Sequence, residues 1–137
     1  MIKAIECIVI MVNDIQKSVE FYTDVLGFSI SNKIDMAEAG LSAVFVEKEG
    51  SRIGLMNYKG KKIPNRSEMG KIKLGKISIP MNDHITFSVD DIEATTIELK
   101  GKGVVFDLEP IQVEGGIKVA FIKDPEGVQL ELVEYPK

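Results

Sequence analysis

The sequence predicts an α+β fold made of two βαβββ modules, at 1–57 and 83–137, whose sheets together enclose a pocket. The first observation behind this prediction is a repeat: CIVIMVNDI at 7–15 is similar to HITFSVDDI at 84–92, a shift of 84 − 7 = 77 residues. The second is that this shift continues without a gap to the end of each module, which indicates a duplicated structural unit. It superposes Ala43 on Ala120, Glu49-Gly50 on Glu126-Gly127 and Leu55 on Leu132.

Each module begins with an apolar strand followed by a helix. The strands are expected near 4–12 and 83–89, and they lead into Asp14 and Asp91, residues suited to cap a helix. Residues at helical spacing, apolar in the first helix and apolar or threonine in the second, then follow until a glycine ends each helix. These residues are Ile15, Val19, Tyr22 and Leu26 before Gly27, and Ile92, Thr95, Thr96 and Leu99 before Gly101-Lys102-Gly103.

Three further strands complete each module. They are expected near 28–34, 41–47 and 52–57, and near 104–109, 117–123 and 128–134. The last hairpin turns at Asp124-Pro125-Glu126-Gly127, where proline and glycine suit a tight turn. Residues 58–82 are rich in glycine and proline, so we interpret them as a linker between the modules.

The linker carries an uneven share of the charge. Between Tyr58 and Pro80 there are seven basic residues and one acid, a charge of +6 in a chain whose net charge is −4. Two interpretations stand: a solvated loop, or a lid that attracts an anionic ligand. The negative net charge argues against a general nucleic-acid-binding protein.

Length and composition are typical of one globular domain. The chain has 137 residues, of which 45% are hydrophobic and 28% charged. The N-terminal apolar run is too short to span a bilayer and lacks a signal-peptide cleavage site, so we expect no membrane partner. The single cysteine, Cys7, forms no internal disulfide, which favours a cytoplasmic location.

Alternation along the outer strands separates two faces of each sheet. One face is apolar and is expected to pack under the helices; it consists of Ile8, Ile10, Ile53, Leu55, Ile85, Phe87, Leu130 and Leu132. The other face mixes apolar and polar side chains, as a ligand cavity does, although facing water or a partner chain is the alternative. It consists of Cys7, Val9, Met11, Arg52, Gly54, Met56, His84, Thr86, Ser88, Gln129, Glu131 and Val133.

Four positions on the mixed face are related by the repeat. Cys7 corresponds to His84, and Gly54 corresponds to Glu131, each at the shift of 77. If the two modules close around a pseudo-twofold axis, these four positions converge at its centre.

Three stretches resemble the vicinal-oxygen-chelate superfamily, which includes glyoxalase I, bleomycin- and fosfomycin-resistance proteins, methylmalonyl-CoA epimerase and extradiol dioxygenases. They are VNDIQKSVEFYTDVLGF, HITFSVDDIEAT and AFIKDPEGVQLELVE, and the resemblance extends over the whole chain. It implies a single glyoxalase-like domain over 1–137, with curved mixed sheets forming a cleft, helices on the outer face, and a divalent metal in that cleft.

The resemblance also implies the metal ligands, which are His or Glu on the first and last strand of each module. Carried over, the positions are Cys7, Gly54, His84 and Glu131. His84 and Glu131 suit Zn²⁺, Ni²⁺, Mn²⁺ or Fe²⁺. Cys7 lies where a histidine is usual, and Gly54 where glyoxalase I has an acid. A three-ligand site of Cys7, His84 and Glu131, as in the fosfomycin-resistance type, is the set that the resemblance leaves, and a thiolate favours Zn²⁺.

By the same resemblance, the function is a lactoylglutathione-lyase-like metal-dependent lyase or isomerase with an incomplete ligand set, acting on a small oxygen-bearing substrate. His84 and Glu131 are the candidate catalytic residues. The candidate substrate-binding residues are Met11, Arg52, Met56, Thr86 and Gln129. Arg52 shares the face of Glu131, with which it pairs or, alternatively, holds a substrate carboxylate or phosphate.

The same residues also allow a function without a metal. The competing function is a metal-free protein that binds or sequesters a small molecule such as a drug, consistent with a roomy face around Gly54. His84 is then a structural residue, and Cys7 a small buried apolar one. A homodimer is expected because sheet edges need covering, with the modules pairing within one chain or across the dimer.

Overall fold

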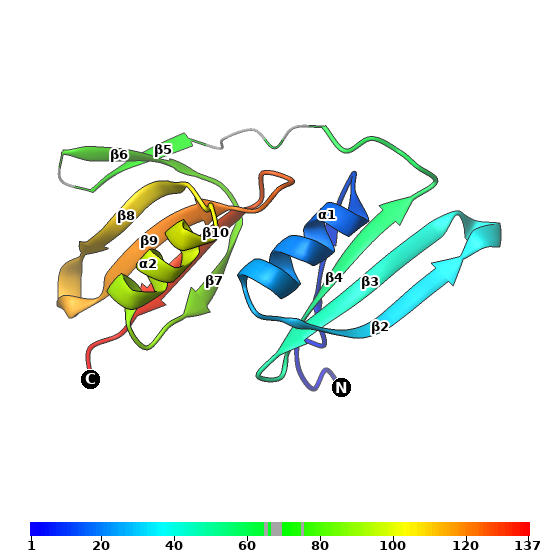
Figure 1. The fold of residues 1–137 in the computed structure, drawn as a ribbon, viewed down its shortest axis with the longest axis horizontal. Coiled ribbons are helices and arrows are strands. Elements are labelled where there is room, and N and C mark those ends of the chain that lie inside the picture. Colours follow the sequence, from blue (N-terminus) through cyan, green and yellow to red (C-terminus); the bar gives the residue numbers. More distant parts are fainter. Residues whose placement is uncertain (65, 67–69, 75) are drawn as a thin grey trace. The chain divides into compact units, whose positions relative to one another are not determined.

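The computed structural model describes residues 1–64, 66, 70–74 and 76–137. The chain forms two compact units, Met1–Pro64 and Asn65–Lys137 (Figure 1). Each unit holds a four-stranded mixed sheet with a helix against one face, which confirms the prediction of an α+β fold with two βαβββ modules. Neither helix in the described ranges is long and apolar enough to cross a membrane.

In the first unit the strand order is β1-β4-β3-β2, with β1 parallel to β4 and the other pairs antiparallel. Its elements are β1 (Ile8–Met11), α1 (Ile15–Glu20), a π-helical turn η1 (Phe21–Val25), β2 (Ser29–Met36), a 3-10 turn η2 (Ala37–Ala39), β3 (Leu41–Lys48) and β4 (Ser51–Tyr58). Asp14 caps α1 as predicted, since its carboxylate accepts a hydrogen bond from the Lys17 N–H at 3.0 Å. The helical segment ends before Gly27, where φ is +81°.

The core of the first unit lies between α1 and the inner strands. Val19 and Tyr22 are buried, as are Ile53 and Leu55 on the helix face of β4. Ile8 departs from the prediction, because 44% of it is exposed. The reason is that β1 is an edge strand, whereas α1 packs over β3 and β4.

The second unit repeats this arrangement in the order β7-β10-β9-β8, with β7 parallel to β10. Its elements are β5 (Gly70–Leu74), β6 (Ile77–Met81), β7 (His84–Ser88), α2 (Ile92–Gly101), β8 (Phe106–Gln112), a 3-10 turn η3 (Glu114–Gly116), β9 (Lys118–Lys123) and β10 (Gln129–Glu134). Ile92 and Leu99 of α2 and Leu130 and Leu132 of β10 are buried, as the spacing predicted.

The repeat holds in the parallel pairs but not in the antiparallel ones. Val9 pairs with Gly54 and Thr86 with Glu131, so β1-β4 and β7-β10 correspond at the shift of 77. Gly54 pairs with Phe45 and Glu131 with Phe121, so β3 and β9 correspond at 121 − 45 = 76. The gapless superposition of Ala43 on Ala120 is therefore wrong. Four residues lie between the paired Glu47 and Arg52, but five lie between the equivalent pair Lys123 and Gln129, and the extra residue displaces β9 by one position.

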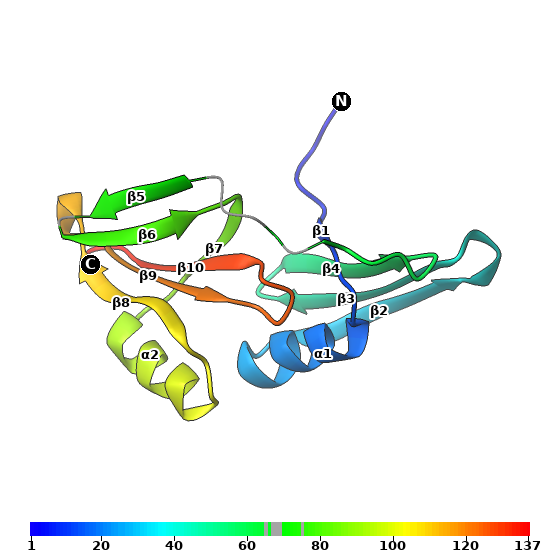
Figure 2. The same ribbon diagram turned by 90° about the horizontal axis from the view of Figure 1, so that it is seen from above.

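A hairpin lies within residues 58–82, the segment whose glycines and prolines predicted a linker. β5 and β6 pair from Gly70↔Met81 to Leu74↔Ile77. In Figure 2 this hairpin covers the face of the second sheet opposite α2. Glycine, proline and lysine hide it in the sequence, and Pro80 is tolerated because a two-stranded sheet consists of edge strands. The interpretation of 58–82 as a plain linker is thus corrected for 70–81.

Candidate functional site

The parallel pairing of β7 and β10 brings four predicted site residues onto one face of the second sheet. His84 lies opposite Gln129, and Thr86 lies opposite Glu131. Because alternate residues of a strand point to the same side, all four side chains share the face that α2 does not cover.

His84 and Glu131 are neighbours on this face. The imidazole Nε2 lies 3.3 Å from Oε1 of Glu131, and the two side chains are 23% and 19% exposed. The hydroxyl of Thr86 donates a hydrogen bond of 2.8 Å to the same Oε1. The pair is therefore partly exposed, and Oε1 of Glu131 is held by both neighbours.

The other imidazole nitrogen of His84 fixes the ring's protonation pattern. Nδ1 lies 2.9 Å from the carbonyl oxygen of Asn82, and a carbonyl oxygen only accepts hydrogen bonds, so Nδ1 carries a proton. In the neutral ring, Nε2 then presents its lone pair beside Glu131. The edge-to-face contact with Phe121, at 5.7 Å between ring centroids, holds the ring plane.

Gln129 is buried, with 2% of it exposed. Its Nε2 donates to the carbonyl oxygen of Pro80 at 2.9 Å, and its Oε1 accepts from the Asn82 N–H at 2.7 Å. Both ends of the amide are thus engaged with the main chain, one at the end of β6 and the other just after it. This residue, predicted to bind substrate, fastens the β5-β6 hairpin to β10.

The β5-β6 hairpin covers the part of this face that lies over β8 and β9. Ile79 forms a buried cluster with Leu108 and Phe121. Ile72 lies directly opposite Ile79 and shares its face, whereas Lys71 and Lys73, on either side of Ile72, point to the other face and are exposed. Their ammonium groups therefore lie on the side away from the cluster. The hairpin therefore presents apolar, not basic, side chains to this face of its own unit.

The corresponding face of the first unit holds the other predicted residues. Met11 pairs with Met56, and both are half-buried. Cys7 is half-buried and lies one residue before β1. Arg52 donates to Glu6 at 2.6 Å and stacks over the ring of Phe45 at 5.1 Å, so within its own unit its partner is Glu6.

The face around Gly54 is not roomy. A methyl group added to Gly54 would lie 2.9 Å from Cε1 of Phe45 and 3.3 Å from Cγ2 of Val9. The ring of Phe45 occupies the space that a carboxylate side chain would need at this position. The sequence did not predict this contact, because alternation separates the two faces of a strand but does not tell which residue of β3 lies opposite Gly54.

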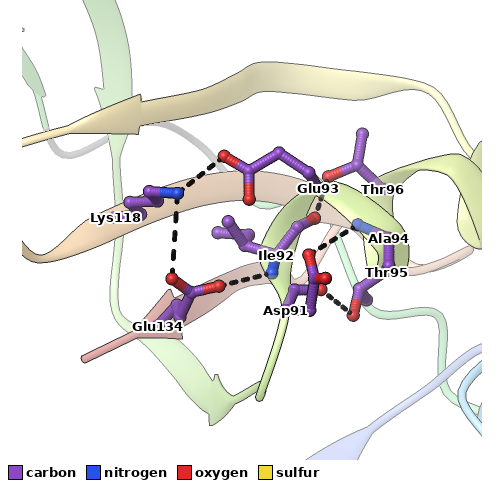
Figure 3. A network of polar contacts seen from close by, with 8 residues as sticks. All are labelled: Asp91, Ile92, Glu93, Ala94, Thr95, Thr96, Lys118 and Glu134. Atoms are coloured by element: carbon purple, nitrogen blue, oxygen red, sulfur yellow. Dashed lines mark hydrogen bonds and ion pairs between the residues drawn. The ribbon is translucent and has the colours of Figure 1, made fainter. Parts of the chain in front are cut away.

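One other acidic group lies at the start of α2 (Figure 3). Among the described residues, the group of three or more potential metal ligands with donor atoms within 4.8 Å of one another consists of Asp91, Glu93 and Glu134. Asp91 and Glu134 accept from the N–H groups of Ala94 and Ile92, at 3.0 and 2.8 Å. The Lys118 ammonium pairs with Glu93 at 2.9 Å.

These contacts show that the acidic group is a structural one. Two of its carboxylates cap the helix, and the third pairs with an ammonium group. The hydrogen bond to Glu93 raises the pKa of Lys118, against the opposing effect of desolvation. The group also lies on the helix side of the sheet, away from His84.

The chain is similar in sequence to a known superfamily and to named relatives within it. The model of the Glyoxalase/Bleomycin resistance protein/Dioxygenase superfamily matches residues 4–132. A protein of Vibrio cholerae named probable lactoylglutathione lyase is 34% identical over 128 residues, covering 90% of this chain and 84% of that protein.

Two further comparisons give a different activity name and a solved fold. Human mitochondrial methylmalonyl-CoA epimerase is 31% identical over 128 residues, covering 91% of this chain and 70% of that protein. The crystal structure of glyoxalase I from Zea mays superposes with a TM-score of 0.76 at 22% identity, covering 96% of this chain and 44% of that one. The fold is therefore the glyoxalase fold, and the activity names differ among the relatives.

Proposed function

We propose, because the chain belongs to the Glyoxalase/Bleomycin resistance protein/Dioxygenase superfamily, that it is a glyoxalase-like metalloenzyme of the lyase or isomerase type. In this proposal the substrate is a small oxygen-bearing molecule, and the site is built on His84 and Glu131. The chain acts as a single glyoxalase-like domain and as a homodimer.

The observation that carries the proposal is the pair of His84 and Glu131. With Nδ1 donating to the Asn82 carbonyl, Nε2 faces a carboxylate oxygen 3.3 Å away, and in the neutral ring this nitrogen carries a lone pair. Two lone pairs at this separation repel each other unless a cation or a proton lies between them. An imidazole whose far nitrogen donates to a carbonyl is the usual form of a metal-ligating histidine.

The donor separation also fits a metal. Zinc binds nitrogen and carboxylate oxygen at about 2.0–2.2 Å, so two donors at a tetrahedral angle lie roughly 3.3 Å apart. His84 and Glu131 would hold such an ion, and we propose the thiolate of Cys7 as a third donor, which favours Zn²⁺. Gly54 supplies no side chain, so the set has three protein ligands.

A bound divalent ion would supply Lewis-acid stabilisation of negative charge on the substrate oxygens. The residues of the chain supply the remaining functions. Thr86 holds Oε1 of Glu131, which orients the carboxylate for moving a proton at the substrate carbon. Met11 and Met56 offer apolar wall, and Arg52 binds an anionic substrate group in exchange for Glu6.

Metal binding is the first test. Protein purified without chelators should contain about one divalent ion per chain by elemental analysis, and the metal-free protein should bind Zn²⁺, Ni²⁺ or Mn²⁺ in calorimetry. His84→Gln and Glu131→Gln should each lower the affinity at least tenfold, while Glu109→Gln, an exposed ion-paired carboxylate, should not. A wild-type protein that neither contains nor binds a stoichiometric ion contradicts the metal part.

Turnover is tested separately with methylglyoxal and glutathione, which a lactoylglutathione lyase joins as S-lactoylglutathione, and with epimerisation of methylmalonyl-CoA. These assays follow the names of the two relatives. Loss of turnover in His84→Gln with retained folding supports catalysis at this pair.

The second candidate function is a metal-free protein that binds or sequesters a small molecule. The packing of Phe45 over Gly54 favours it, because this position has neither a carboxylate nor space for one. In this case His84→Ala leaves the affinity for a ligand found by screening nearly unchanged. A large loss of turnover in the same variant contradicts this alternative.

A further inference from the structure

The buried amide of Gln129 has an unusual set of partners. Both are main-chain groups of one short segment: the carbonyl of Pro80 and the N–H of Asn82. A carbonyl only accepts and an N–H only donates, so the orientation of the amide is fixed by its partners. Such a doubly bonded, 2% exposed side chain holds the segment between β6 and β7 in one place.

That segment also supplies the group that orients His84. The N–H of Asn82 is held by Gln129, and the carbonyl of Asn82 lies 2.9 Å from Nδ1 of His84. The in-register pairing of Gln129 with His84 places the two side chains beside each other on β10 and β7. A continuous path of hydrogen bonds therefore runs from the Gln129 amide through Asn82 to the imidazole.

The first unit shows that the repeat itself does not require an amide here. The residue equivalent to Gln129 is Arg52, which pairs with the exposed Glu6 and is itself 26% exposed in its side chain. The residue equivalent to His84 is Cys7, whose thiol has no tautomer for a hydrogen bond to select. The buried amide is thus found in the unit that carries the histidine.

We propose that Gln129 is a positioning residue, whose amide places the Asn82 carbonyl so that His84 keeps its proton on Nδ1 and turns the Nε2 lone pair toward Glu131. Its effect on metal affinity rests on the proposed function. The positioning of the imidazole does not, because it can be measured in the metal-free protein.

The experiment uses the fact that His84 is the only histidine of the chain. Its two ring nitrogens give an unambiguous signal in ¹⁵N-detected imidazole NMR, recorded on the metal-free full-length protein in alkaline solution with the ring neutral. The wild-type protein should show the Nδ1–H tautomer and slow exchange of the Asn82 amide proton. Gln129→Met, of similar volume but without the amide, should shift the population toward Nε2–H.

The control is Leu99→Ala, which disturbs the buried helix face of the same unit and should lower the thermal midpoint without changing the tautomer. Zn²⁺ affinity in Gln129→Met should fall about 10- to 100-fold, as for other groups that orient a metal-ligating histidine.

Two results overturn the inference. The first is an Nε2–H tautomer in the wild-type protein, a measurement that does not depend on the folding of a variant. The second is an unchanged tautomer in folded Gln129→Met, with an unchanged Zn²⁺ affinity where the protein binds the metal. If the wild-type protein binds no metal, the metal part of the proposed function fails, and the tautomer comparison still decides the role of Gln129.

Discussion

At the residue scale, Gly54 shows how one missing side chain alters the candidate site. A Cβ added to Gly54 would lie 2.9 Å from the ring of Phe45, so the ring would have to shift to admit it. We expect Gly54→Ala to lower the free energy of unfolding by about 1–2 kcal/mol, the usual cost of overpacking. Urea denaturation measures this. In a Phe45→Ala background the cost should disappear, and an equal cost in both backgrounds would contradict the assignment to the Phe45 contact.

A second residue-scale prediction concerns Lys118 and alkaline pH. The hydrogen bond to Glu93 raises the pKa of Lys118 above its ordinary 10.5. A raised pKa in the folded state means that the lysine stabilises the fold below pH 10.5 and that this contribution is lost as pH rises through the folded value. The thermal midpoint of Lys118→Gln should therefore lie below that of the wild-type protein at pH 8 and approach it at pH 11.5.

If the difference in midpoint between wild type and Lys118→Gln stays constant from pH 8 to 11.5, the Lys118 interaction is not electrostatic.

The sequence predicted the face that the residues of β7 and β10 occupy, because alternation along a strand needs only the position of the strand. It therefore placed His84, Thr86, Gln129 and Glu131 together. It did not predict that Gln129 bonds to the main chain, or that Arg52 pairs with Glu6. These contacts depend on rotamers and on neighbouring segments, which alternation does not specify.

At the element scale, the β5-β6 hairpin gives the clearest prediction. Ile79 is 1% exposed in the cluster with Leu108 and Phe121, whereas Ile72, directly opposite it in the hairpin, is 38% exposed. Ile79→Ala should destabilise the protein by about 2–4 kcal/mol, as for other buried large-to-small changes. Ile72→Ala should cost less than half as much, because most of its surface lies outside the cluster.

Both changes are measured by chemical denaturation, with hydrogen exchange of the amides of β6 as a local probe. Equal costs for Ile79→Ala and Ile72→Ala would contradict the packing of the hairpin on the second sheet.

The elements themselves were largely predictable. Asp14 and Asp91 cap α1 and α2 as expected, since their side chains accept from the Lys17 and Ala94 N–H groups. The hairpin was missed although Ile72, Leu74, Ile77 and Ile79 alternate with polar residues or proline. Lysine, glycine and proline are typical of loops and conceal this period of two, although the period is the stronger physical signal.

At the scale of the whole molecule, the exposed edge of the first sheet leads to a prediction about assembly. β1 is an edge strand in which Ile8 and Val9 are each 44% exposed, and Ile5 before it is 83% exposed. An exposed apolar edge of this kind is a template for pairing with another chain. Light scattering should therefore give about 30 kDa, twice the 15.1 kDa of one chain, and Val9→Lys should shift the mass toward the monomer. A wild-type mass of 15.1 kDa at micromolar concentrations would refute the homodimer.

The longer turn at 124–128 has a consequence for recombining the two halves of the chain. β9 follows the repeat at 76 residues and β10 at 77, so the one-residue difference is contained in this turn. A genetic crossover inside the turn would join a strand from one unit to a partner strand from the other unit, with the pairing displaced by one residue. Such a displacement turns every side chain of that strand to the opposite face of the sheet. Chimaeras should remain foldable when the junction keeps the turn intact with both of its strands, which makes β9-turn-β10 the smallest exchangeable cassette.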